Sequence, residues 1–188
     1  MLTAIMITSI CMKGLTMTQA EKDRLREINR QIEILQAEKA TLNPYAGLKD
    51  MSNKAFGEKW SENWICSKCS NLTKNNGSGH DLRSANGKLW EVKSSRLPAL
   101  QITFNQCHPY ECDYFLFVLY DTVEGEEIIY LVPSKDIKNK FCYSRQHGHS
   151  TSKEEADCIS IGYNKTNKNL LETEYRVLNW EALNSLAQ

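Results

Sequence analysis

Between Thr18 and Leu42, apolar residues recur every three or four positions, the spacing of one face of an α-helix. Thr18 and Glu21 have the spacing of a capping box at its start, and Asn43-Pro44 ends the pattern. Lys39 occupies one of the heptad positions of the stripe. The apolar members of the stripe are Leu25, Ile28, Ile32, Leu35 and Leu42. We predict a three-heptad helix that packs on its own domain or pairs with a partner helix, as in a coiled coil.

Beyond residue 45, helical spacing alternates with strand-like runs. Residues 113–121 are apolar on both faces, which is typical of a buried central strand. The expected elements are a helix over 53–66, a loop over 67–79, a hairpin over 80–95, a short helix within 100–107, strands over 113–121 and 127–132, a short helix beginning at Pro133, a strand over 158–163 and a helix over 179–186.

This order predicts an α/β fold, a mixed β-sheet flanked by helices and preceded by a coiled-coil-like helix. We expect three parts. Residues 1–16 form a leader that is disordered or precedes the true start at Met17, residues 17–44 form the N-terminal helix, and residues 45–188 form one domain.

Composition narrows the classes of function. The 188 residues include 23 Lys plus Arg and 23 Asp plus Glu, so the net charge is zero, which argues against a histone-like binder. A cleft lined by a few basic groups can still hold a nucleic acid. Seven cysteines without a secretory signal fit a reducing cytoplasm, and no apolar run reaches the length of a membrane span.

The stretch from His80 to Ser95 carries the candidate chemistry. Asn86-Gly87 is a two-residue turn signal between strand-like runs, so the stretch predicts a hairpin. Side chains alternate along a strand, so Glu91 and Lys93 point the same way, and Asp81 lies on the facing strand. Carboxylate oxygens suit Mg²⁺, and a lysine can hold a water beside the metal. Such a group of side chains can hydrolyse a phosphodiester.

Asp81 followed by Glu91-Val92-Lys93 resembles the active-site hairpin of the PD-(D/E)XK nuclease superfamily, which has the restriction-endonuclease-like fold. The resemblance implies that Asp81, Glu91 and the carbonyl of Val92 bind Mg²⁺, for which Mn²⁺ can substitute. It also implies that Lys93 positions or activates the attacking water.

Many members of the superfamily add a glutamate from a preceding helix, and Glu58 after Gly57 matches that feature. The resemblance therefore adds Glu58 to the metal ligands. His80 stands where the motif has proline, and the matched core runs from about Ala55 to Pro133.

The resemblance makes residues 45–188 a nuclease domain and favours a type II restriction endonuclease that cleaves double-stranded DNA as a homodimer. The helix over residues 17–44 is then the candidate dimer contact. Two alternatives are a junction-resolving or repair nuclease of the same superfamily, and a non-catalytic DNA-binding module stabilised by zinc.

Two groups of polar residues are candidates for contacts with DNA. Arg96, Gln101, Asn105 and Gln106 follow the active strand, although any polar segment after a strand would look similar. Arg145-Gln146-His147 lies in a polar loop, and arginine and glutamine pair with the edges of guanine and adenine. An exposed loop without a role fits this segment equally well.

The cysteines offer a candidate zinc site. Cys66 and Cys69 form a CxxC pair, and Cys107 and Cys112 with His108 would supply the other half. Four residues separate Cys107 from Cys112, where a second CxxC pair would have two. Ordinary thiols at a helix end and in a loop are the simpler interpretation.

Overall fold

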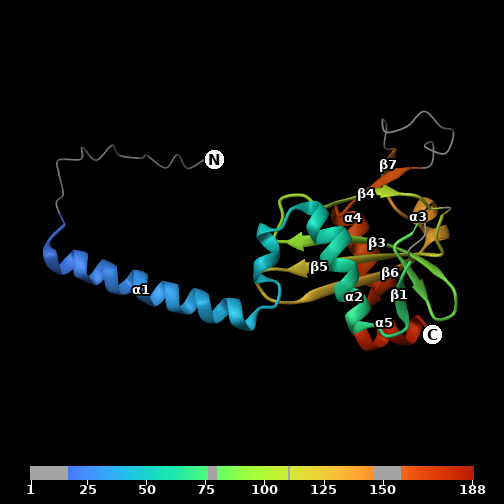
Figure 1. The fold of residues 1–188 in the computed structure, drawn as a ribbon. Coiled ribbons are helices and arrows are strands. Elements are labelled where there is room, and N and C mark those ends of the chain that lie inside the picture. The colour runs from blue at the N-terminus through green and yellow to red at the C-terminus, as the bar shows by residue number, and fades with distance from the viewer. Residues whose placement is uncertain (1–16, 76–79, 110, 146–157) are drawn as a thin grey trace, which may run out of the picture. The chain divides into compact units, whose positions relative to one another are not determined.

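The computed structural model describes residues 17–75, 80–109, 111–145 and 158–188 (Figure 1). The chain divides into two units, Met1–Thr41 and Leu42–Gln188, and each is described by itself. The predicted α/β class is confirmed: a long N-terminal helix is followed by a mixed sheet with flanking helices. In the described part of the chain, no helix has the length and apolar character needed to cross a membrane.

Helix α1 spans Gln19–Leu42 and begins with the predicted capping box. The backbone N–H of Thr18 donates to the Glu21 carboxylate at 2.7 Å, and the backbone N–H of Glu21 donates to Thr18 Oγ1 at 3.3 Å. Ion pairs three residues apart, such as Arg26 with Asp23 at 2.9 Å, lie on its surface. None of the residues of α1 is buried, so its apolar stripe is exposed.

The second unit is built on a six-stranded sheet in the order β1-β2-β3-β5-β6-β9. The strands are β1 (Leu72–Lys74), β2 (Leu82–Ser84), β3 (Leu89–Leu97), β5 (Tyr114–Asp121), β6 (Glu127–Pro133) and β9 (Arg176–Val177). Strands β3 and β5 are parallel, and the other neighbours are antiparallel. Every residue from Phe115 to Tyr120 is buried, which confirms the predicted central strand.

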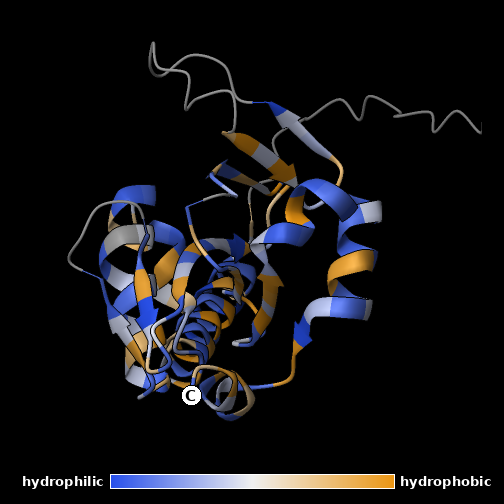
Figure 2. Cartoon of the chain, turned by 90° about the vertical axis from the view of Figure 1, so that its right-hand side faces the viewer, coloured by the Kyte–Doolittle hydropathy of each residue, from blue (hydrophilic) through white to orange (hydrophobic). Residues whose placement is uncertain are grey.

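Alternating residues of β5 enter two different cores. Leu116 and Val118 join the first core, which η2, α2 and α5 cover, whereas Phe115 and Phe117 join the second core on the opposite face. Figure 2 shows apolar residues both on strands and on the helices that flank them. The helical segments of this unit are η1 (Ala46–Asp50), η2 (Ala55–Ser61), α2 (Glu62–Lys68), α3 (Ser134–Lys140), α4 (Lys165–Leu170), η4 (Leu171–Tyr175) and α5 (Trp180–Leu186).

A three-stranded sheet, in the order β4-β8-β7, helps to cover the second core. Its strands are β4 (Thr103–Cys107), β7 (Tyr143–Arg145) and β8 (Ile159–Gly162). The predicted short helix within residues 100–107 is therefore wrong, because this segment forms β4. Ile102, Thr103 and Phe104 have β-branched or aromatic side chains that favour a strand, and β4 pairs with a strand more than fifty residues away.

Some of the remaining elements agree with the sequence, whereas β1, β7, α4, η4 and β9 were not predicted. The helix over 53–66 is one helical segment whose middle, η2, has wider π-helical turns. The expected loop over 67–79 contains β1, which pairs with β2. Asn179 caps α5 as expected, by accepting a hydrogen bond from the Ala182 N–H at 2.8 Å.

The β2–β3 hairpin is confirmed, but four residues, 85–88, lie between its strands where the sequence predicted a two-residue turn. The Gly87 N–H donates to the Ser84 carbonyl, and the Ser84 N–H donates to the Lys88 carbonyl, each at 2.9 Å. Gly87 has φ +83°, a left-handed conformation that costs glycine little. This loop sets the register of β2 against β3.

Gly87→Ala should lower the free energy of unfolding by about 1 kcal/mol, because a Cβ is strained at positive φ whatever the space around it. Gly47→Ala is the control, since Gly47 has open space around it and no positive φ. Urea denaturation compares the two. Equal midpoints would mean that the hairpin loop tolerates an L-residue at 87.

Candidate active site

Strands β2 and β3 bring Asp81, Glu91 and Lys93 together. Glu91 and Lys93 lie on the face of β3 opposite the buried Trp90 and Val92, as the alternation predicts. Asp81 directly precedes β2, and its N–H donates to the Trp90 carbonyl at 3.2 Å, so it lies opposite Glu91. All three side chains line an open pocket of about 450 Å³ and a neighbouring pocket of about 370 Å³.

Short hydrogen bonds order these side chains. Lys93 Nζ donates to Glu91 Oε1 at 2.6 Å, and the Val92 N–H donates to Asp81 Oδ2 at 2.7 Å. The side chains of Glu91 and Lys93 are each 17% exposed. The group is therefore held inside the pocket while still reachable from solvent.

Burial sets the charge state of the pair. Burial raises the pKa of Glu91 to about 7; the nearby Lys93 opposes this rise and the Asp81 carboxylate adds to it. Burial is the largest effect on the pKa of Lys93 and acts to lower it, but the charge and the hydrogen bond of Glu91, with a smaller effect of Asp81, together raise the pKa above its ordinary value. Lys93 is thus a cation at neutral pH, which suits donation of hydrogen bonds and does not suit proton abstraction.

The oxygen atoms at this place fit a hard cation such as Mg²⁺. Along a strand, the N–H and C=O of one residue point to the same edge, so the Val92 carbonyl lies on the edge where its N–H meets Asp81. That edge therefore offers two carboxylates and one carbonyl oxygen. Within the described ranges, no group of three or more His, Cys, Asp or Glu side chains is arranged to bind a metal, so any ion would rely on this smaller set.

Glu62 is a pocket residue that sequence reasoning missed. It lines both pockets, forms an ion pair with Lys74 at 3.0 Å, and its side chain is 16% exposed. The predicted Glu58 lies in η2, but its side chain is outside the described part of the structure, so its role stays a prediction. Asn53, Gly57 and Glu62 line one pocket at spacings of four and five, because a π-helical turn takes up an extra residue. A glutamate four positions after Glu58 was the available signal.

The predicted DNA-contacting residues separate into three groups. Asn105 and Gln106 line the pocket with Asp81 and Glu91. Arg96 instead donates to the carbonyls of Leu48 and Met51 and to Asn53 Oδ1, each at 2.6–2.7 Å, so it ties β3 to the segment before η2.

The others lie apart from the pocket or outside the described residues. Gln101 is exposed just before β4 and lines neither pocket, and Arg145 is exposed at the end of β7. Gln146 and His147 are outside the described residues, so their prediction stays open.

The structure does not bring the four candidate zinc ligands together. Cys66 and Cys69 belong to the first core and Cys107 and Cys112 to the second, on opposite faces of the large sheet. Burial raises the pKa of Cys69 to about 11 and that of Cys107 to about 12, so both are thiols at neutral pH. A tetrahedral zinc site needs its thiolates close together on one side of the sheet. These cysteines are therefore core residues and not a zinc site.

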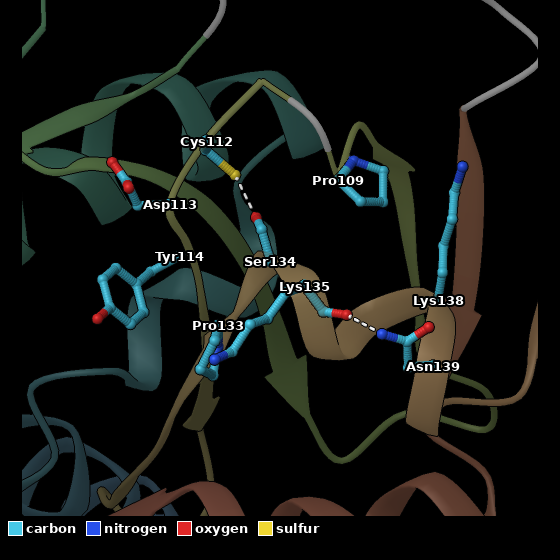
Figure 3. A pocket seen from close by; sticks show the side chains of 9 residues that line it. All are labelled: Pro109, Cys112, Asp113, Tyr114, Pro133, Ser134, Lys135, Lys138 and Asn139. Atoms are coloured by element: carbon cyan, nitrogen blue, oxygen red, sulfur yellow. Dashed lines mark hydrogen bonds between the residues drawn. The ribbon is translucent and has the colours of Figure 1, made fainter.

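A separate pocket of about 600 Å³ lies at the start of β5 and the end of β6 (Figure 3). Cys112 Sγ lies 3.1 Å from Ser134 Oγ at its edge, and Lys135 and Lys138 of α3 are among its lining residues. The segment between β4 and β5 serves both sites, since His108 and Glu111 line the smaller active-site pocket while Pro109 and Cys112 line this one.

No protein-family model matches the chain, and no curated protein is significantly similar to it. The assignment of function therefore rests on the residues and geometry described above.

The raised pKa of Glu91 predicts how stability depends on pH. Its folded-state pKa of about 7 exceeds the ordinary 4.5, so between these values the folded protein binds more protons than the unfolded chain. The contribution of Glu91 is therefore fully present below pH 4.5 and is lost as the pH rises through 7.

The test compares the free energies of unfolding of the parent and of Glu91→Gln, both measured in EDTA. The value for the parent minus that for the variant should fall by on the order of 3 kcal/mol from pH 4.5 to 8. The glutamine cannot lose a proton, so the variant lacks this slope. Urea denaturation at each pH measures it, and a constant difference between the two proteins across the range would contradict the burial argument.

Proposed function

We propose that this protein is a Mg²⁺-dependent endonuclease that hydrolyses phosphodiester bonds of double-stranded DNA, in the manner of a type II restriction enzyme. The observation that carries the proposal is the convergence of Asp81, Glu91 and Lys93 in one solvent-accessible pocket. Two carboxylates and an ion-paired lysine on a hairpin are chemically suited to phosphoryl hydrolysis.

Each residue has a part in this chemistry. Asp81, Glu91 and the Val92 carbonyl would hold the ion, and Mn²⁺ would bind the same oxygens. The ion supplies positive charge that neutralises the phosphate and stabilises the charge that builds on its oxygens. Lys93 stays protonated beside Glu91, so it holds the attacking water and the phosphate by hydrogen bonds.

The reaction itself is a simple displacement. Water adds to phosphorus while the bond to the leaving sugar oxygen breaks. The water loses a proton to solvent, and the leaving oxygen takes one up. The side chains contribute by orientation and charge, because the reacting atoms come from water and DNA alone.

Neutral net charge is compatible with this substrate. Among the described residues, the positive groups at the site include Lys93 in the pocket and Lys74, which pairs with Glu62, while Lys135 and Lys138 line the separate pocket on α3. Contacts of lysine with phosphates position the duplex, whereas amides such as those of Asn105 and Gln106 are suited to polar contacts close to the cut. Weak non-specific attraction would leave the enzyme free to ignore bulk DNA.

Lys93→Ala should slow DNA cleavage by about 10²- to 10³-fold while leaving DNA binding intact, because it removes a preorganised donor to the phosphate. Lys88→Ala is the control. Lys88 lies in the same hairpin, pairs with Asp113 at 2.9 Å and is half exposed, so its removal should change little.

The measurement is Mg²⁺-dependent cutting of phage DNA on a gel, with binding followed by mobility shift. A Lys93→Ala protein that cuts DNA at the parental rate would contradict the role assigned to Lys93. Discrete bands from the parent support a restriction enzyme, whereas preference for a four-way junction over linear duplex would favour a junction-resolving or repair nuclease.

The exposed stripe of α1 supports a homodimer. Leu25, Ile32 and Leu35 are 45%, 45% and 63% exposed, at heptad positions that meet a partner helix in a coiled coil. Three heptads form a stable helix only when this face is covered. A second copy of α1 would cover it, and a dimer would bring two active-site hairpins to the two strands of a palindromic site.

Leu35→Glu should convert the dimer to a monomer in light scattering, because a buried unpaired charge opposes helix pairing. Ile34→Glu is the matched control: Ile34 is 51% exposed on the same helix but lies off the heptad stripe, so this variant should stay dimeric. A parent that is monomeric, or two variants with the same mass, would remove α1 from any interface.

A further inference from the structure

Strand β4 contains a β-bulge at its end nearest the active site. Phe104 pairs with Ile161 and Cys107 with Ile159, so Asn105 and Gln106 both lie opposite the single residue Ser160. Two residues facing one is the definition of such a bulge. Ser160 Oγ donates to Asn105 Oδ1 at 2.9 Å, which fastens the first of the two bulged residues.

The bulge resolves a conflict in the sequence of β4. Phe104 and Cys107 are both buried in the second core, yet residues three apart point to opposite faces of a regular strand. One extra residue lets both enter the core. As a result, Asn105 and Gln106 are consecutive and both exposed.

Gln106 carries the backbone strain of this arrangement. Its φ is +53°, and among the described residues it is the one non-glycine residue with a positive φ. Residues other than glycine, asparagine and aspartate rarely adopt this conformation, because Cβ then crowds the following carbonyl oxygen. Such strained positions gather at functional sites, where the side chain serves a purpose that glycine could not.

Gln106 lines the same two pockets as the proposed catalytic residues. The two active-site pockets share five lining residues, and these are Glu62, Asp81, Glu91, Lys93 and Gln106. Gln106 is the neutral member of this set. A cationic side chain here would pair with the carboxylates, whereas an amide can donate to an anionic substrate without neutralising the groups that would hold the metal.

We propose that the carboxamide of Gln106 donates a hydrogen bond to a non-bridging oxygen of the scissile phosphate, beside Lys93. This inference rests on the proposed nuclease function and adds a substrate-contacting residue from the small sheet, so that the phosphate is held between the two sheets. The strain at residue 106 is retained because glycine, which would relieve it, has no donor.

The test is Gln106→Gly, assayed for both stability and single-turnover cleavage of duplex DNA. The variant should have a higher urea midpoint than the parent, because glycine accepts φ +53° without strain. Its cleavage rate should fall about ten- to hundredfold, the range for loss of one hydrogen bond to a charged group. Gln106→Asn should recover part of the rate, since asparagine tolerates this conformation and keeps an amide.

Ser144→Gly is the matched control, because Ser144 is an exposed strand residue of the same small sheet without a positive φ. It should lower the urea midpoint and leave cleavage unchanged. A Gln106→Gly variant that cuts at the parental rate overturns the inference while the nuclease function stands. A lowered midpoint overturns the strain argument, and a parent that cuts no DNA overturns the proposed function itself.

Discussion

The parallel pairing of β3 with the fully buried β5 is the constraint on which the rest of this structure depends. Because β5 sends alternate side chains into two cores, β3 beside it must follow the same alternation, with Trp90 and Val92 on one face and Glu91 and Lys93 on the other. A slip of one residue would turn the ionisable pair towards the first core and the tryptophan towards the pocket. Burial of apolar side chains in the two cores thus fixes where Glu91 and Lys93 lie.

That position places Glu91 and Lys93 in a partly buried pocket with little water. Local pairing within the active-site hairpin offsets the cost of burying their charges. Glu91 is paired with Lys93 and Asp81 with the Val92 N–H, yet burial still raises the pKa of Glu91 towards neutrality. A site with excess negative charge in a partly buried pocket is poorly satisfied by protein groups alone. This is the physical reason why a divalent cation fits the proposed function.

The second wall of the pocket comes from β4, and it is also a by-product of core packing. Phe104 and Cys107 are both buried in the second core. A regular strand would have one residue fewer between them, and the extra residue forms the bulge. Gln106 is thereby held at positive φ beside the carboxylates. The π-helical turns of η2 act similarly, since they bring Glu62 to the same pocket.

The sequence by itself determined features that depend on neighbouring residues: the capping box of α1, the buried run of β5, the presence of the hairpin and the alternation of Glu91 and Lys93. These follow from periodicity and turn chemistry, which act over a few positions. Only the tertiary structure decided that residues 103–107 form a strand, that Gln106 and Glu62 reach the pocket, and that the four cysteines divide between two cores. Each of these depends on partners far away in the chain, and a bulge or a π-turn shifts which face a residue takes without leaving a signal in local composition.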